Sequence, residues 1–114
     1  MSLKVSLLAG FFQGPLFYHD PEEDRWASHD VELAGEDLSL SPQLVADLTA
    51  WDEEYQAIYD DNYPPDSKFS TPEAEWAWIE RGKVLAARIK QESPLVASVD
   101  YQAHGHYERG TCVF

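Results

Sequence analysis

Residues 41–58 of the chain read SPQLVADLTAWDEEYQAI, and this stretch has the clearest structural pattern in the sequence. Its apolar side chains recur at alternating steps of four and three residues, at Leu44, Leu48, Trp51, Tyr55 and Ile58. This spacing places them on one face of an α-helix. Ser41 is a favourable N-cap and Pro42 suits the first helical position. We therefore predict an amphipathic helix that ends at residues 62–65, because the prolines there cannot continue it.

A second helix is predicted after the first one, and it ends at Ser93, which precedes a proline. Its start is either Ser70, which forms a capping box with Glu73, or Thr71, which is followed by a first-turn proline. Its apolar face is formed by Ala74, Trp78, Leu85 and Ile89.

Gly82 lies on the apolar face of this second helix. Glycine inside a helix costs about 1 kcal/mol relative to alanine. We expect Gly82 to allow the helix over residues 42–58, or the sheet, to approach closely. Trp51 and Trp78 lie on the two apolar faces, so both are predicted to be core residues.

Short β-favouring runs flank the two helices. Strands are predicted over residues 4–9, 16–18, 25–27 and 95–101, with a last strand through Tyr107 and pairing of the apolar tail 111–114. Residues 28–40 are acidic and weakly patterned, and we expect a loop or an edge strand there. The order of elements predicts a single α+β domain over residues 1–114, with a small, mostly antiparallel sheet and a two-helix hairpin packed on one face.

The net charge of −13 is concentrated in one part of the chain. Residues 20–66 contain fifteen acidic residues and one base, Arg25, whereas residues 67–114 are neutral overall. This charge argues against direct binding of nucleic acid or of anionic membranes, and the sequence has no apolar run of about 18 residues that could span a membrane. The acidic segment is interpreted either as a solvated face or as a surface that meets a basic partner.

Five residues are candidates for contact with such a partner. Asp47, Glu54 and Asp61 fall off the apolar face of the first helix, where their carboxylates can pair with arginine side chains. Trp26 and Trp76 lie outside the clear core pattern, and exposed aromatic side chains often anchor interfaces. We expect the acids to steer association and the tryptophans to supply buried contact.

The sequence contains neither a glycine-rich phosphate loop nor a Gly-x-Ser-x-Gly motif, so we expect no enzymatic activity and no cofactor. The histidines leave a small metal-dependent enzyme as an alternative, because two histidines on one strand face with a carboxylate can bind zinc. They are His19, His29, His104 and His106. We expect them to be structural instead. Cys112 is the single cysteine, which excludes an internal disulfide and favours a packing role and a cytoplasmic location.

Two stretches resemble a known group of proteins: LSLSPQLVADLTAW at residues 38–51 and NYPPDSKFSTPEAEW at residues 62–76, followed by Gly82, Leu85-Ala86 and Arg88. They are similar to a mostly uncharacterised group of small acidic bacterial proteins, common in actinobacteria, which share the Leu-Ser-Pro helix start and the Tyr-Pro-Pro-Asp-Ser linker. The resemblance covers about residues 36–100. Proteins of this build resemble immunity proteins, which are encoded beside secreted toxins.

The resemblance implies a binding module that neutralises a basic partner, such as a toxin or a nuclease, by occluding its site. Three other functions stay open: mimicry of a DNA duplex by rows of carboxylates, the histidine-dependent metal enzyme, and a structural or regulatory subunit. The oligomeric state is also left open by the sequence.

Overall fold

The computed structural model describes residues 3–20 and 22–114. The strands are β1 (Leu3–Leu8), β2 (Leu16–Asp20), β3 (Arg25–His29) and β4 (Val96–Ala103). The helices are α1 (Val31–Asp37), α2 (Pro42–Ala57), the short 3₁₀ helix η1 (Pro64–Asp66) and α3 (Pro72–Glu92). The predicted α+β class is confirmed.

The four strands form one sheet in the order β3-β2-β1-β4. The pairs β1–β2 and β2–β3 are antiparallel, whereas β1 and β4 run parallel to each other. The sheet is therefore mixed, which corrects the expectation of a mostly antiparallel sheet. The chain forms the β2–β3 hairpin and all the helices before it returns as β4, and such a long crossover permits parallel pairing. The apolar pattern of an isolated strand does not reveal its direction.

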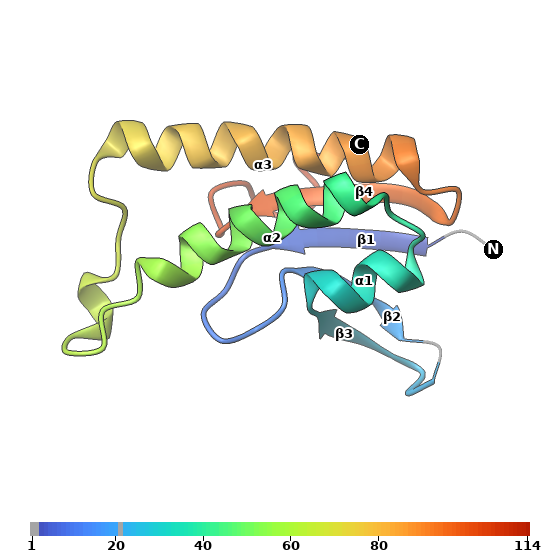
Figure 1. Cartoon of the computed structure of the whole chain (residues 1–114), viewed down its shortest axis with the longest axis horizontal. Helices are drawn as coiled ribbons and strands as arrows, with labels where there is room; N and C mark the ends of the chain where they lie inside the picture. Colours follow the sequence, from blue (N-terminus) through green and yellow to red (C-terminus); the bar gives the residue numbers. More distant parts are fainter. Residues whose placement is uncertain (1–2, 21) are drawn as a thin grey trace.

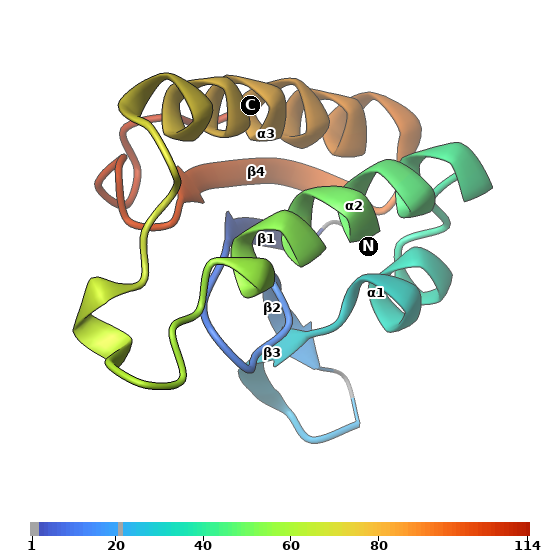
Figure 2. The same ribbon diagram turned by 60° about the vertical axis from the view of Figure 1, so that its left-hand side comes forward.

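The long helices α2 and α3 lie together over one face of the sheet, as predicted (Figure 1). Figure 2 shows β4 and β1 beneath them and α1 beside the start of α2. None of the helices in residues 3–20 and 22–114 is long and apolar enough to cross a membrane.

The core lies between the sheet and these helices, and the two predicted helix faces point into it. Leu44, Leu48 and Trp51 of α2 are fully buried, and so are Trp78 and Ile89 of α3. The predicted core positions of both tryptophans are thus confirmed.

Gly82 allows the close approach that the sequence suggested. A Cβ atom at this position would lie 2.6 Å from Nε1 of Trp51 and closer still to the hydroxyl of Tyr101. Both neighbours are fully buried, so neither can move away easily. Gly82 therefore lets α3 pack directly on both α2 and β4.

The helix caps agree with the sequence patterns. The Ser41 side chain accepts a hydrogen bond from the backbone N–H of Leu44, and Thr71 accepts one from that of Ala74. Thr71 is thus the N-cap of α3, not Ser70. Helix α2 ends at Ala57, before the expected stop at residues 62–65, and a turn follows in which Asp60 accepts backbone hydrogen bonds from residues 62 and 63.

The expectation of a loop or edge strand over residues 28–40 is wrong for most of this segment, because residues 31–37 form α1. Asp30 caps this helix by accepting a hydrogen bond from the N–H of Leu33 (2.8 Å). Val31, Ala34 and Leu38 are buried at a helical spacing. The helix has only seven residues and includes a glycine, so its pattern is too short to stand out in the sequence.

The end of the chain differs in one respect from the prediction. No strand continues through Tyr107, because the chain turns after β4 and Gly105 has a φ of 106°. The apolar tail does pair with β4: the backbone N–H groups of Val99 and Phe114 each donate to the carbonyl of the other residue.

Candidate interaction surface

The acidic segment extends from the end of β2 through β3, α1 and α2 to η1. In Figure 1 the elements of this segment lie below α3 as drawn, and the β1–β2 loop and β2 lie among them. The carboxylates are therefore distributed over several elements, which hold them in different environments.

Asp47 and Glu54, two of the predicted contact residues, face arginines of α3. Asp47 accepts a hydrogen bond from Arg88 at 2.7 Å, and this bond, with a second one from Gln43, lowers the pKa of its carboxyl. Glu54 forms an ion pair with Arg81. Both carboxylates are thus already paired within the chain.

A surface cavity of about 350 Å³ lies between α2 and α3 at this point. Its wall combines the two ion pairs with the side chain of Val84, which is 60% exposed. We call this cavity the interhelix groove. Its positive and negative charges are balanced, so it has no excess of acid to offer a basic partner.

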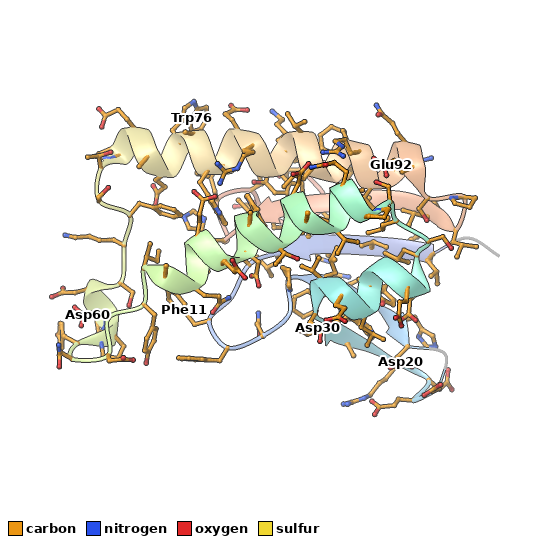
Figure 3. The ribbon with its side chains drawn as sticks, in the orientation of Figure 1. Phe11, Asp20, Asp30, Asp60, Trp76 and Glu92 are labelled. Carbon is orange, nitrogen blue, oxygen red and sulfur yellow. The ribbon has the colours of Figure 1, made fainter. Side chains whose placement is uncertain are left out.

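The other three predicted contact residues lie on separate elements. Asp61 was expected on the first helix, but α2 ends at Ala57 and Asp61 is exposed in the loop that follows. Trp26 is half exposed on β3, where it borders a cavity on the uncovered sheet face together with Arg109. Trp76 is half exposed on the outer side of α3 (Figure 3). Its ring makes an edge contact with His106. The structure thus does not gather the five predicted residues into one cluster.

An aromatic cluster that the sequence analysis missed lies where the β1–β2 loop meets the end of α2. We call it the aromatic tip, and it consists of Phe11, Phe12, Tyr55 and Tyr59. The ring of Phe11 stacks on Tyr55 with centroids 4.5 Å apart, and Tyr59 makes edge contacts with Phe11 at 5.0 Å and with Phe12 at 4.7 Å. The outermost ring, that of Phe12, is 79% exposed.

The backbone of the loop is held in place by Gln56 of α2. The side-chain oxygen of Gln56 accepts a hydrogen bond from the N–H of Phe12 at 3.1 Å, and its amide nitrogen donates to the carbonyl of Gly10 at 2.8 Å. The same nitrogen lies 3.2 Å from a carboxylate oxygen of Asp52. Phe12 has a φ of 60°, a left-handed conformation that is uncommon outside glycine, asparagine and aspartate.

The segment that carries Tyr55 and Tyr59 is rich in carboxylates. Residues 52–66 contain six acidic residues and neither lysine nor arginine. Burial raises the pKa of the Asp52 carboxyl. Asp60 directly follows Tyr59, and Figure 3 places Asp60 and Phe11 at the same end of the molecule. Tyr63, in the loop beyond, is 58% exposed.

A signal for this cluster is present in the sequence. Two adjacent phenylalanines lie between Gly10 and the Gly14-Pro15 pair, in a segment too rich in turn residues to be a strand. Large apolar residues in such a turn either fold back onto the core or remain exposed. Periodicity cannot distinguish these two outcomes, because it describes helices and strands only.

The four histidines are not gathered into one site. His104 and His106 do not share a strand face: His104 lies 3.1 Å from Glu75 of α3, while His106 is exposed in the turn. His29 is buried and stacks on Tyr18 at 3.7 Å. Within residues 3–20 and 22–114, no group of three or more histidine, cysteine or acidic side chains is arranged to hold a metal ion.

Comparison with known families points to one of them. A protein-family model described as Serratia CdiI immunity protein-like matches residues 3–104. No curated protein matches the chain significantly. The matched region contains all four strands up to the end of β4, both long helices and the whole aromatic tip. It extends well beyond residues 36–100 and agrees with the resemblance to immunity proteins.

Proposed function

The chain belongs to the Serratia CdiI immunity protein-like family, and on this premise we propose that it neutralises a toxin by binding a basic surface around the toxin's functional site. Membership in an immunity-protein family implies a toxin as the partner. The basic character of that toxin and the occlusion of its site are the parts that we add.

The observation that carries this proposal is the uneven distribution of charge. Residues 20–66 carry a net charge of −14, so the surface that they form has an excess of negative charge. Complementary potentials accelerate the encounter of two proteins and disfavour incorrect partners. A positively charged toxin would therefore be attracted to this surface and away from the neutral C-terminal part.

A nuclease is the toxin class that fits best, because enzymes that bind nucleic acid use lysine and arginine to contact phosphates. Carboxylates of the immunity protein would occupy the same cationic side chains, so the substrate and the inhibitor would exclude each other. In this proposal residues 1–114 act as one α+β domain, without enzymatic activity or cofactor of their own. We propose that the complex forms in the cytoplasm.

The test uses the toxin domain that the proposal expects to be encoded beside the gene of this chain, as it is for immunity proteins. Co-expression of the chain should restore growth to cells that produce the domain. The purified proteins should form a complex whose association rate falls as salt is added, because salt screens the steering charges. Absence of a complex, or an association rate independent of salt, would contradict the proposal.

A second measurement addresses occlusion. If the toxin domain is a nuclease, DNA or RNA substrate should compete with this chain for the toxin. A stable ternary complex of toxin, nucleic acid and immunity protein would show that the active site stays open. That result would exclude occlusion while leaving toxin binding intact.

A further inference from the structure

We propose that the aromatic tip is the anchor by which this chain docks on its toxin, with the Phe12 ring buried among cationic side chains of the toxin. The inference rests on the proposed function and deepens it, because it assigns the contact to one end of the molecule. None of the residues predicted from the sequence to contact the partner belongs to this cluster.

The exposure of Phe12 is the first observation. With 79% of its surface exposed, it exceeds the other large hydrophobic side chains that are exposed in the described residues. A ring of this kind gains much apolar contact when a partner covers it. Aromatic side chains in the centre of an interface commonly contribute most of the binding free energy.

The second observation is that the ring is positioned before any partner arrives. Phe12 contacts Tyr59, Tyr59 contacts Phe11, and Phe11 stacks on Tyr55. Tyr55 in turn stacks on the buried Trp78 at 5.4 Å, so the tip is continuous with the core. A contact residue that is already ordered loses less conformational entropy on binding.

Gln56 adds to this positioning through its hydrogen bonds to both sides of the loop. The left-handed backbone at Phe12 would be less strained with glycine in its place. A phenylalanine that is both strained and exposed contributes little to folding. Its presence is explained if it contacts a partner.

The charge around the tip identifies the chemistry of the occupant. Apart from Glu54, which pairs with Arg81, the acids of residues 52–66 form no ion pair with a lysine or arginine in the described residues, so the segment that carries Tyr55 and Tyr59 has an excess of negative charge. Arginine fits such a surface best, since its guanidinium stacks on aromatic rings and pairs with carboxylates. A second copy of this chain fits poorly, because a two-fold contact at the tip would bring these acids against one another.

The interhelix groove is the competing site on the same side of the molecule. Its acids, Asp47 and Glu54, are already paired with Arg88 and Arg81. A toxin would have to replace these internal partners before it could use the two carboxylates. Asp61, near the tip, has no ion-pair partner in the described residues, and its carboxylate is free to pair.

The experiment compares Phe12→Gly with Val84→Ala in binding to the toxin domain used in the test of the proposed function. Val84 is the matched control, because it is an exposed apolar residue of the interhelix groove. Phe12→Gly should raise the dissociation constant at least about thirtyfold, which is the effect that defines a hot-spot residue. Val84→Ala should change it less than about twofold.

The folding of the variant is checked at the same time. Phe12→Gly should unfold at a denaturant concentration no lower than that of the unaltered chain, since glycine tolerates the left-handed conformation. Weakened binding together with retained stability is therefore the expected combination. It cannot be attributed to partial unfolding.

The contribution of charge is tested by Asp61→Asn. Glu108→Gln is the control, because Glu108 is also an exposed acid but lies outside the acidic segment, in the region after β4. Asp61→Asn should slow association at low salt more than the control does. If the toxin binds Phe12→Gly as tightly as the unaltered chain, the aromatic tip is not the anchor, although the proposed function stands. If the unaltered chain does not bind the toxin, the proposed function and this inference both fail.

Discussion

Trp51 and Trp78 lie face to face in the core, with ring centroids 4.4 Å apart and ring planes 3° from parallel. Each indole N–H donates to the backbone carbonyl of the other residue, at 3.1 Å from Trp51 and 2.8 Å from Trp78. This reciprocal pair joins α2 to α3 and satisfies both indole donors in a fully buried position. It also supports Tyr55, and through Tyr55 the aromatic tip.

Replacement of Trp78 by phenylalanine should lower the free energy of unfolding by about 2 kcal/mol. The variant loses indole contacts in the core and the hydrogen bond from the Trp78 indole N–H to the Trp51 carbonyl. Urea denaturation followed by circular dichroism measures the change. Trp76→Phe is the control, because Trp76 is half exposed, and its effect should stay below about 0.5 kcal/mol. If the two substitutions lowered the free energy of unfolding equally, the reciprocal hydrogen bonds between Trp51 and Trp78 would not contribute measurably to stability.

Gly82→Ala should destabilise the protein by about 1–3 kcal/mol, as overpacked cores do. Helix propensity alone would favour this substitution by about 1 kcal/mol, so the expected sign is set by the contacts with Trp51 and Tyr101. Ala77→Gly, at an exposed position of the same helix, measures the propensity effect separately. Thermal or urea denaturation of both variants provides the comparison. A gain in stability for Gly82→Ala would mean that α3 can shift away from its neighbours.

Two of the six tyrosines should resist ionisation until the protein unfolds in alkali. Burial is the main cause that raises the pKa of Tyr18 and of Tyr101 far above the usual value, and the hydroxyl of Tyr18 also donates to Asp37 at 2.7 Å. Because the pKa values are raised in the folded state, their contribution to stability is complete below the unfolded pKa of about 10 and is lost as the pH rises above it.

Ultraviolet absorbance measures tyrosinate during such an alkaline titration, and circular dichroism reports the fold in parallel. The Tyr18→Phe variant should lose one of the late-titrating groups. It should also be less stable at neutral pH, since Asp37 loses a hydrogen-bond donor. Ionisation of all six tyrosines while the circular dichroism spectrum is unchanged would contradict the assignment.

Charge reversal at Asp47 and at Asp61 should have different effects on folding. Asp47→Lys places a cation against Arg88, which now pairs with Asp47 at 2.7 Å, so the denaturation midpoint should fall. Added salt should reduce this loss by screening the repulsion. Asp61→Lys removes a carboxylate from an acidic, solvent-exposed loop and should leave the midpoint unchanged or higher. If Asp47→Lys has no effect on the midpoint at low salt, the ion pair with Arg88 does not contribute to the fold.

The two long helices could be predicted from the sequence because their signals are local and complete. Ser41 and Thr71 form the caps, and the apolar spacing continues for several turns. The sequence also indicated the close packing at Gly82. Glycine destabilises the interior of a helix, so its presence on an apolar face suggests that a neighbouring element packs closely against it. The apolar character of the tail predicted that it pairs, whereas its partner β4 is shown only by the structure.

Features that depend on tertiary contacts could not be predicted. The direction of β4 relative to β1 is set by the path of the chain through the helices. The pairing of Asp47 and Glu54 with arginines depends on residues 41 and 27 positions away along the chain. The aromatic tip depends on a contact between a loop and a helix end that are more than 40 residues apart.

The pairing of the tail with β4 has a consequence for the behaviour of the protein at high concentration. An open sheet edge can add strands from other molecules and so begin aggregation. At β4, which is one edge strand of the sheet, the backbone groups of Val99 are already hydrogen-bonded to Phe114 of the tail. On the other side the sheet ends at β3, which has five residues and adjoins the acidic turn residues Glu22, Glu23 and Asp24. Self-assembly is thus opposed by backbone pairing at one edge and by charge repulsion at the other.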